Sequence, residues 1–540
     1  MSVANLDAYR KKIEEQVEAE QRGRQPKEKD GGGEGPPIEF VRKCYLANEV
    51  GDSLLYNHLH RDRFVHNVIA KDNAGWLRYV GPHWEFDYHK ESKAAVEAVA
   101  QCYLSLLQEV EEQLRKLAGD DKEERKALNK QRTALIDRLN RLRSDRGRSS
   151  VLACAISNKT EDNDPLTVHP DRLDQEPWLL PVANGLIDLR TGEFREGGDP
   201  RLYLTLASPT RWEGIDCPCP TWERFLDEVL DGKREVIDYL HKVLGYTITG
   251  LRSERLFVVF HGPHGHNGKD TLIGAVQHVL GPLAGPVQTE LLMSQRFSRN
   301  TSGPSPDILA LKGLRLAYAA ETEKGNSFAA GQIKRFSGGN QLIGRGLNDK
   351  EQTYFWPTHT LFLICNDLPS APAKDSAFWE RIRVFVFPWS YVAKPKESYQ
   401  RLWDPELDLK LRAEAPGILA WLVRGCIRWQ REGLIAPQKV LDDSRAYRAH
   451  EDDLQQFIDE CCTVDFTDAT TGNATNASML YQRYRTWWEA GHTSMRGALS
   501  SKDFSDELVL KGFTKFKSNK IFYQFIQIRP ELDQKPEVQR

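Results

Sequence analysis

The sequence predicts an α/β protein with a parallel sheet at its centre, flanked by an α+β N-terminal domain and a small C-terminal domain. Three observations predict this fold. Mostly β-branched, aromatic and aliphatic runs at 256–260, 314–320 and 359–365 have the length of buried strands. Each run is followed by glycine or polar side chains, and an amphipathic helical pattern follows the first one. Buried parallel strands that present polar residues at their ends fit this combination.

The whole chain has the composition of an ordinary soluble protein. Its 540 residues predict two to four domains, since single cores rarely exceed about 250 residues. Charged residues make up 28% and hydrophobic residues 40%, and no apolar run approaches the roughly 20 residues that cross a bilayer. The formal net charge of −3 excludes a surface coated with basic residues. It leaves nucleic-acid binding open, because basic residues can be confined to a channel.

The nine cysteines predict reduced thiols rather than disulfides. The N-terminus is charged and lacks the apolar stretch of a secretory signal, so we expect a cytoplasmic protein. Cys217 and Cys219 form a C-x-C pair and Cys461 and Cys462 are adjacent, but neither pair has a second pair at zinc-like spacing. We therefore expect no structural zinc.

The N-terminal part predicts a tail followed by a domain. Residues 1–37 are polar, charged and glycine-rich at their end, which predicts a disordered tail and linker. An α+β domain is expected over 38–210, with short strands first and a helical hairpin at about 90–145 that breaks near Gly119. Leucines seven residues apart leave a coiled-coil seam as an alternative to packing within the same domain.

Two further elements lead into the central sheet. Asn184-Gly185 between apolar runs predicts a hairpin turn. A helical collar is expected over 211–250, because apolar residues recur at helical spacing between Trp222 and Leu244.

A glycine-rich loop joins the first buried strand to the amphipathic helix. Strand, loop and helix together predict a nucleotide phosphate site, because glycines let backbone N–H groups surround a phosphate and the helix N-terminus adds positive potential. Lys269 is expected to reach the β- and γ-phosphate oxygens. The residues expected to bind ATP are Gly262, Gly265, Asn267, Gly268, Lys269, Asp270 and Thr271.

The loop departs from the usual G-x-x-x-x-G-K-[ST] pattern at two positions. Pro263 stands where the first glycine is usual, and Asp270 takes the place of the Ser or Thr that binds Mg²⁺. Either Asp270 or Thr271 then has to serve the metal. The alternative is a glycine-rich turn without nucleotide function, and the agreement of strand, loop and helix argues against it.

Polar side chains also follow the second and third strands. Glu321 and Glu323 end the second run, where carboxylates can hold Mg²⁺ and polarise the attacking water. We assign metal binding and general-base work to Glu321, with Glu323 close behind; two solvated loop glutamates are the alternative. Asn366 follows the third run and is expected to contact the γ-phosphate or orient water.

Two arginines, Arg381 and Arg383, precede a fourth apolar run at 384–387. An arginine at this position is a candidate arginine finger, which stabilises the transition-state charge on a neighbouring subunit's ATP.

In this order, the motifs resemble those of superfamily 3 DNA helicases, and most closely the helicase part of the phage, plasmid and poxvirus primase-helicase family. Two departures occur: Asn340 stands where the family has aspartate, and Glu380 replaces the first arginine of a pair, which selects Arg381 as the finger and Arg383 as its reserve. The matching positions are Asn267-Gly268-Lys269, Glu321, Ile333-Lys334 with Gly338-Gly339, Asn366 and Trp379-Glu380-Arg381; upstream, Val182 to Leu189 resembles the domain that precedes the motor in this family.

The resemblance implies an AAA+-like P-loop ATPase core over 251–395 that uses ATP and Mg²⁺. It implies a ring, an expected hexamer, that translocates 3′ to 5′ on single-stranded DNA and acts on forked DNA in a bacterial host cytoplasm. It also places a pore hairpin between the second and third strands, with Lys334, Arg345 and Lys350 as DNA contacts. On charge alone, a solvated loop is the alternative.

The C-terminal part predicts a helical segment over 396–440 and a winged-helix-like domain over 441–540, where helices precede a basic hairpin. A structural cap on the ring is the alternative. The aromatic cluster at 481–488 is expected in the core rather than on a base-stacking surface. Residues 40–210 show no primase constellation, so a separate primase or polymerase partner is expected. An ATP-regulated initiator or loader, and a small-molecule kinase, are the rival functions.

Overall fold

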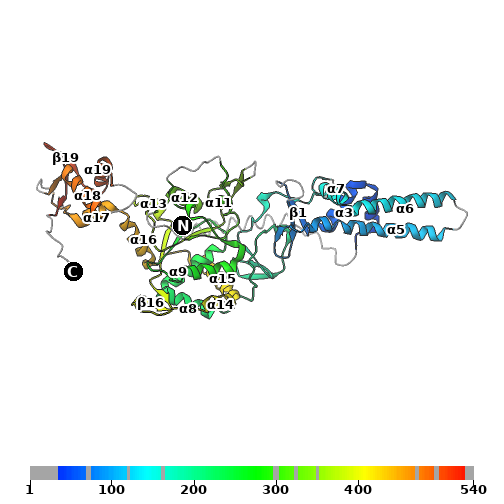
Figure 1. The fold of residues 1–540 in the computed structure, drawn as a ribbon, viewed down its shortest axis with the longest axis horizontal. Coiled ribbons are helices and arrows are strands. Elements are labelled where there is room, and N and C mark those ends of the chain that lie inside the picture. The colour runs from blue at the N-terminus through cyan, green and yellow to red at the C-terminus, as the bar shows by residue number, and fades with distance from the viewer. Residues whose placement is uncertain are drawn as a thin grey trace. The chain divides into compact units, whose positions relative to one another are not determined.

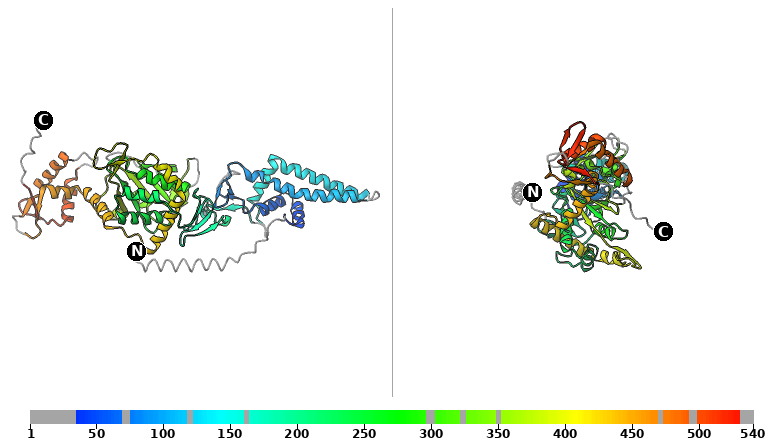
Figure 2. Two further views of the ribbon diagram at one scale, coloured as in Figure 1. Left: turned by 90° about the horizontal axis from the view of Figure 1, so that it is seen from below. Right: turned by 90° about the vertical axis from the view of Figure 1, so that its left-hand side faces the viewer.

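The computed structural model describes residues 35–68, 75–117, 122–159, 164–295, 303–320, 326–347, 352–468, 473–491 and 498–529 (Figures 1 and 2). These residues form two compact units, each taken by itself below. One comprises 35–66, 75–76 and the described part of 87–167, and the other comprises 67–68, 77–86 and the described part of 168–529. Within the described ranges, no helix has both the length and the apolar character that a membrane span requires.

The first unit is built mainly of helices. Its longest two, α5 and α6, run side by side as a hairpin in the interval 90–145 (Figure 1). Apolar residues at helical spacing, such as Tyr103 on α5 and Leu135 on α6, are fully buried in the shared core. The helices are α2 (Ile38–Leu46), α3 (Asn48–His60), α4 (Glu91–Ala94), α5 (Glu97–Lys116), α6 (Lys122–Arg143) and α7 (Asp145–Ala155); β1 (Phe64–Asn67) follows α3, and β4 (Thr167–Val168) follows α7.

A buried ion-pair network ties this hairpin to α3. Asp52 on α3 is almost completely buried and accepts hydrogen bonds from Arg138 Nη2 at 2.9 Å and Tyr103 OH at 3.0 Å. Its second oxygen accepts from Arg141 Nη2 at 3.1 Å. Burial raises the pKa of Asp52, while the two arginines and Tyr103 oppose that rise. The carboxylate therefore depends on these partners to stay charged inside the core.

The second unit is centred on a five-stranded parallel sheet with the order β14-β8-β13-β10-β9. β13 lies in the middle, with Leu363 opposite Val259 of β8 on one side and Ala319 of β10 on the other. The strands are β8 (Phe257–His261), β9 (Ala284–Pro286), β10 (Leu316–Ala320), β13 (Thr360–Cys365) and β14 (Ile382–Val386). The predicted parallel sheet is confirmed, because the three apolar runs form its adjacent central strands.

Helices cover both faces of this sheet. Successive strand residues point to opposite faces, so Val258 and Phe260 enter one core while Phe257 and Val259 enter the other. The first core is completed by α8 (Pro220–Val229), α9 (Arg234–Thr247), α10 (Lys269–Leu280) and α15 (Ala415–Glu432). The second is completed by α11 (Pro306–Leu309), α12 (Ala330–Phe336) and α13 (Ser376–Trp379).

An antiparallel sheet, β5-β6-β7, packs against the first of these cores. The hairpin predicted at Asn184-Gly185 is present, with Val182 opposite Gly185. Sequence patterns placed residues up to 210 in the N-terminal domain, whereas contacts group the chain from 168 onward with the parallel sheet. The physical reason is that Leu180 and Ile187 bury themselves among residues of α9 and α15. The strands are β5 (Leu179–Val182), β6 (Gly185–Asp188) and β7 (Glu193–Glu196).

Shorter elements complete this part of the second unit. They are β2 (Trp76–Tyr79), β3 (Trp84–Phe86), β11 (Leu342–Gly344), β12 (Thr353–Phe355), β15 (Ser390–Val392), β16 (Gln400–Leu402), α14 (Leu407–Ala413), and four 3₁₀ turns, η2 (Pro170–Arg172), η3 (Pro200–Leu202), η4 (Gly281–Leu283) and η5 (Thr289–Leu291).

Helix α16 (Gln438–His450) leads into a small C-terminal module with its own core. The module contains α17, α18 and α19 and an antiparallel sheet of order β18-β20-β19. Tyr484 is fully buried and Tyr481, Trp487 and Trp488 pack on the same core, so the predicted core role of this cluster is confirmed. The elements are α17 (Asp453–Cys461), β17 (Cys462–Val464), β18 (Ala474–Asn476), α18 (Ala477–Gly491), α19 (Ser501–Leu510), β19 (Lys515–Lys517), β20 (Ile521–Gln524) and β21 (Ile526–Ile528).

Candidate nucleotide site

The glycine-rich loop lies between β8 and α10, at the carboxyl end of the central strands. Gly268 caps α10 with φ +84°, a left-handed conformation that favours glycine. A Cβ at Gly268 would also lie 2.8 Å from Val229 Cγ1, so α8 packs directly against this turn. Gly262 is needed for space, because its Cβ would lie 2.0 Å from Asn267 Nδ2 and 2.7 Å from Lys269 Nζ. These two glycines bring the backbone close to the Lys269 ammonium.

Lys269 is the centre of the site. Its side chain is almost completely buried, and its ammonium donates hydrogen bonds to Asn366 Oδ1 at 2.9 Å and to Asn267 Oδ1. Asn267 in turn donates from Nδ2 to the His264 carbonyl. Burial lowers the pKa of Lys269, and the charge of Asp270 only partly offsets this. Within the described residues, the hydrogen bonds of this buried ammonium thus go to neutral amide oxygens, which suits a cation that will meet an anionic ligand.

Asn366 reaches Lys269 because β13 lies next to β8. Cys365, the last residue of β13, is opposite His261, the last residue of β8, and Gly262 N donates to the Cys365 carbonyl at 3.2 Å. The strand ends therefore present the loop and Asn366 at the same edge of the sheet. The sequence places the glycine-rich loop and Asn366 after two different strands, and the structure brings Asn366 into contact with Lys269.

Asp270 and Thr271 both lie in the first turn of α10, with Asp270 exposed and Thr271 half-buried. Glu321 and Glu323 fall outside the described residues. β10 ends at Ala320, directly before Glu321, and Ala320 is opposite Ile364 of β13. Among the described residues, no group of three or more His, Cys, Asp or Glu side chains could hold a metal ion. The hydroxyl and carboxylate oxygens of Asp270 and Thr271 are donors that Mg²⁺ accepts.

A short two-stranded ribbon holds the loop from outside, and sequence reasoning missed it. Ser390 Oγ donates to the Gly265 carbonyl at 2.7 Å, and Tyr391 N donates to the His266 carbonyl at 2.8 Å. The His264 ring stacks on Tyr399 with 4.0 Å between centroids. The β15–β16 ribbon thus fixes three successive residues of the loop. No local sequence motif marks these contacts.

Arg381 and Arg383 lie at the opposite edge of the sheet. The Arg381 carbonyl accepts from Phe257 N at 2.8 Å, so Arg381 is level with the first residue of β8, whereas the glycine-rich loop follows its last residue. The strand between them spans about 13 Å. Arg381 donates to the Ala377 carbonyl, and Arg383 donates to the Glu380 carbonyl at 2.9 Å. Neither arginine is placed next to the Lys269 of its own chain.

The predicted DNA contacts have different surroundings. Lys334 forms an ion pair with Asp375 at 2.6 Å, and Asp375 caps α13 by accepting from Phe378 N at 3.1 Å. Partial burial raises the pKa of Asp375, but these hydrogen bonds outweigh it and the pKa is lowered. Arg345 follows β11 of the β11–β12 hairpin and pairs through its backbone with Ser305. Lys350 lies outside the described residues.

Tyr447 on α16 contacts both segments that lead to the candidate catalytic residues. Its hydroxyl donates to the Pro369 carbonyl, three residues after Asn366. Its ring packs edge-on against Trp379, with 5.1 Å between centroids, two residues before Arg381. Ala371 N also donates to Glu451 Oε2 at 2.6 Å, just beyond α16. This helix therefore braces the connection between β13 and α13.

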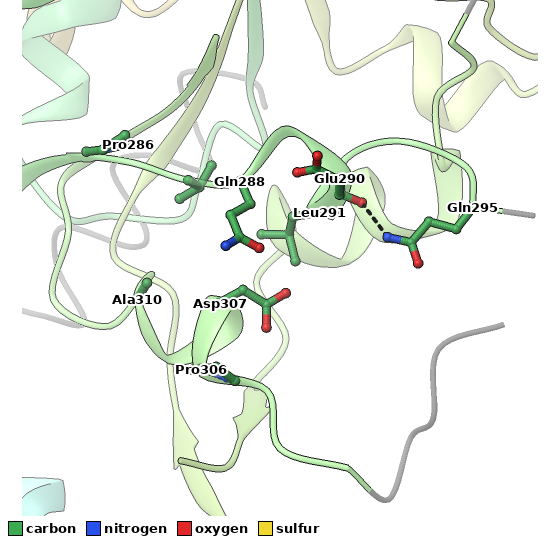
Figure 3. A pocket seen from close by; sticks show the side chains of 9 residues that line it. Pro286, Gln288, Glu290, Leu291, Gln295, Pro306, Asp307 and Ala310 are labelled. Atoms are coloured by element: carbon green, nitrogen blue, oxygen red, sulfur yellow. Dashed lines mark hydrogen bonds between the residues drawn. The ribbon is translucent and has the colours of Figure 1, made fainter. Parts of the chain in front are cut away.

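A separate hollow of about 580 Å³ lies between the end of β9, η5 and α11 (Figure 3). Gln288, Glu290 and Asp307 line it, and Gln295 Nε2 donates to the Glu290 carbonyl at 3.4 Å. None of the residues predicted from the motifs lines this hollow, and we assign it no part in the nucleotide site.

Comparisons with known proteins match parts of this chain to one family and to viral relatives. Residues 57–231 match the family described as "D5 N terminal like". A putative helicase of Acanthamoeba polyphaga mimivirus is 30% identical over 336 residues, which are 59% of this chain and 34% of that protein. A putative helicase of Frog virus 3 is 29% identical over 255 residues, 45% of this chain and 25% of that protein. A putative primase of African swine fever virus is 25% identical over 372 residues, 64% and 37% of the two chains.

The family match and the viral relatives confirm the resemblance to the phage and viral primase-helicase family. It spans about a third of the length of the mimivirus and African swine fever virus relatives. The apo C-terminal region of NrS-1 overlaps 69% of this chain and 88% of its own, at 12% identity and a TM-score of 0.38.

Proposed function

We propose that this chain is an ATP- and Mg²⁺-dependent replicative DNA helicase of a phage, plasmid or provirus. The observation that carries the proposal is the 2.9 Å hydrogen bond from Lys269 Nζ to Asn366 Oδ1. It joins the phosphate loop to the polar end of β13, and Glu321 directly follows the adjacent strand β10. Nucleotide hydrolysis needs phosphate binding, water orientation and a metal-linked carboxylate in one place. Two viral relatives, both putative helicases, support the helicase assignment.

The donor set at the start of α10 suits ATP with Mg²⁺. Backbone N–H groups of the loop and the N-terminus of this helix favour phosphate. Asp270 or Thr271, together with Glu321, would hold the ion through oxygen. Bound Mg²⁺ would neutralise charge on the phosphates. Glu321 then serves as the base that polarises water, with Glu323 as its reserve.

The position of Arg381 supports a ring. Since Arg381 lies at the edge of the sheet opposite its own phosphate loop, it serves as an arginine finger only on the ATP of a neighbouring subunit. Arg383 is the reserve for this role. We propose a homo-oligomer, a hexamer by the family resemblance, that translocates 3′ to 5′ on single-stranded DNA in a bacterial host cytoplasm. A separate primase or polymerase completes replication.

Two regions are proposed to contact DNA. The β11–β12 hairpin is the candidate for the pore, with Arg345 and Lys350 as phosphate contacts, while Lys334 is already paired with Asp375. The C-terminal module is proposed as a winged-helix-like domain, since three helices and the three-stranded sheet β18-β20-β19 enclose one core.

The test is steady-state ATP hydrolysis with and without single-stranded DNA, followed by strand displacement on forked DNA. Wild type is compared with Lys269→Ala, Glu321→Gln and Arg381→Ala. DNA-stimulated turnover that all three variants lose, together with strand displacement by wild type, supports the helicase. ATP binding with negligible turnover, and intact assembly in Glu321→Gln, supports the alternative of an ATP-regulated DNA-binding initiator or loader.

A further inference from the structure

The C-terminal module, residues 453–468, 473–491 and 498–529, distributes its charge unevenly. From Leu508 to Arg529 the sequence contains no Asp or Glu, but it contains several basic residues. The charge of one of these residues is already balanced within the protein, because Lys511 forms an ion pair with Asp452 at 2.7 Å. The basic residues of this stretch are Lys511, Lys515, Lys517, Lys520 and Arg529. Most of the remaining positive charge is therefore on the β19–β20 hairpin.

Two lysines lie at the tip of this hairpin. Lys517 is the last residue of β19, and Lys520 directly precedes β20. Both side chains are exposed, and neither forms an ion pair with any residue that the structure describes. Ser518 N donates to the Lys520 carbonyl at 3.0 Å, which closes the turn between them. The pair is therefore held on an ordered turn rather than on a long loop.

The hairpin is also stiffened behind this tip. Phe516 and Phe522 are opposite each other in the antiparallel pair and stack with 5.7 Å between ring centroids. On the neighbouring rung, Lys515 lies over the Tyr523 ring and donates to Ser505 Oγ at 2.8 Å. Cross-strand aromatic pairs stabilise such ribbons. The lysines at the tip thus lose less conformational freedom when they bind a ligand.

Helix α19, the third helix of the module, has the opposite charge. It carries one lysine, Lys502, against Asp503, Asp506 and Glu507, a net charge of −2. Glu507 forms an ion pair at 2.7 Å with Lys374, in the segment between β13 and α13. Exposed carboxylates repel phosphates, so this helix is unsuited to lie along a DNA backbone. Its ion pair with Lys374 gives it a protein contact instead.

We propose that the module binds DNA through the tip of the β19–β20 hairpin, with Lys517 and Lys520 on phosphates of the backbone, and not through α19. This rests on the proposed function only for the identity of the ligand as DNA. Phosphate contacts carry no sequence information, so binding by this hairpin is independent of base sequence. Each lysine contributes about 0.9 to the slope of log affinity against log salt on duplex DNA, or about 0.7 on single strands.

The test uses the full chain without nucleotide, and fluorescence anisotropy with labelled DNA between about 50 and 200 mM salt. The double variant Lys517→Gln with Lys520→Gln is compared with Lys502→Gln, which removes the exposed lysine of α19. The double variant is expected to reduce the slope by about 1.8 on duplex DNA or about 1.4 on single strands. Lys502→Gln is expected to leave the slope at the wild-type value.

An unchanged salt slope in the double variant would overturn the proposal. A reduction of the slope in Lys502→Gln equal to that in the double variant would also overturn it. A preference of more than about tenfold for one of two unrelated duplex sequences would also overturn it, because backbone contacts do not read bases. ATP turnover with single-stranded DNA, measured on separate portions of the same samples, separates this proposal from the helicase itself. A wild type without turnover even with this DNA contradicts the motor, and a reduced salt slope in the double variant of that protein still supports the hairpin.

Discussion

The hydrogen bond between Asn366 and Lys269 can be tested directly. The Lys269 ammonium is buried and bonded to amide oxygens, and Asn366 supplies one of them at 2.9 Å. Replacing Asn366 by Ala removes a hydrogen bond to a charged group, which contributes about 1.5–3 kcal/mol. If that contribution is made in the transition state of hydrolysis, Asn366→Ala lowers kcat/KM for ATP by about 10- to 150-fold.

Asn366→Asp separates the charge of this group from its shape. The variant places a carboxylate where the amide oxygen now lies, and at 2.9 Å the attraction to Lys269 is about 4–6 kcal/mol at an effective dielectric constant of about 20. The cost of burying the new charge opposes part of this gain. The ion pair holds Lys269 in the free protein and competes with a γ-phosphate. We therefore expect ATP affinity to fall at least about tenfold, while the melting temperature does not fall.

The measurements are steady-state ATP turnover, binding of a fluorescent ATP analogue and thermal unfolding. Asn340→Ala is the matched control, because Asn340 is an exposed asparagine of the same unit. An Asn366→Ala variant whose kcat/KM stays within about twofold of wild type refutes the catalytic role. An Asn366→Asp variant that binds ATP as tightly as wild type refutes the proposed competition for Lys269.

Further outcomes follow from the same geometry. Lys269→Ala and Arg381→Ala are each expected to abolish turnover alone. An equal mixture of the two should regain roughly a quarter of wild-type turnover by random pairing, because each variant supplies the residue that its neighbour lacks. No recovery of turnover in subunit-exchange assays would exclude a finger in trans. Since burial lowers the pKa of Lys269, its charge is lost at a lower pH than that of a solvated lysine. ATP affinity should therefore fall as pH rises toward the usual lysine pKa of 10.5. Equilibrium ATP binding that does not change up to that pH would contradict this. Arg315→Ala should lower the free energy of unfolding of the second unit by about 2–4 kcal/mol, because the buried guanidinium donates to the Pro177 carbonyl at 2.8 Å and to the Leu179 carbonyl of β5 at 3.3 Å. Chemical denaturation checks this, with Arg315→Lys as a partial rescue. Equal stability of wild type and Arg315→Ala would refute it. Tyr447→Phe keeps the ring on Trp379 but loses the hydroxyl contact, so kcat should fall while ATP affinity stays at the wild-type value; a loss of affinity without a change in kcat would point to a different role.

Local patterns were sufficient where the physics is local. The apolar run predicted at 256–260 appears as β8 at Phe257–His261, and the run at 359–365 appears as β13 at Thr360–Cys365. Burial on both faces requires an unbroken apolar stretch, and the chain shows that stretch without reference to any other segment. The glycines around Lys269 were likewise visible, because a left-handed turn and a close backbone approach each require this residue type.

Ion-pair partners that lie far along the chain are invisible in the sequence. Lys334 pairs with Asp375, 41 residues away, and its predicted contact with DNA stays a prediction. A lysine has the same appearance in a sequence whether it is solvated or paired. The predictions for Glu321, Glu323 and Lys350 fall outside the described residues and stay predictions.

The sequence by itself determined the α/β class, the glycine-rich loop with Lys269, and the polar residues at the ends of the buried strands. Only the tertiary structure decided which of these residues meet. The order of the strands places Asn366 on Lys269 across 97 residues, folds Ser390 and Tyr391 onto the loop, and sends Arg381 to the opposite edge of the sheet. The physical reason is that periodicity and turn chemistry act over a few residues, whereas strand order is settled by how the two apolar faces of the whole sheet are covered.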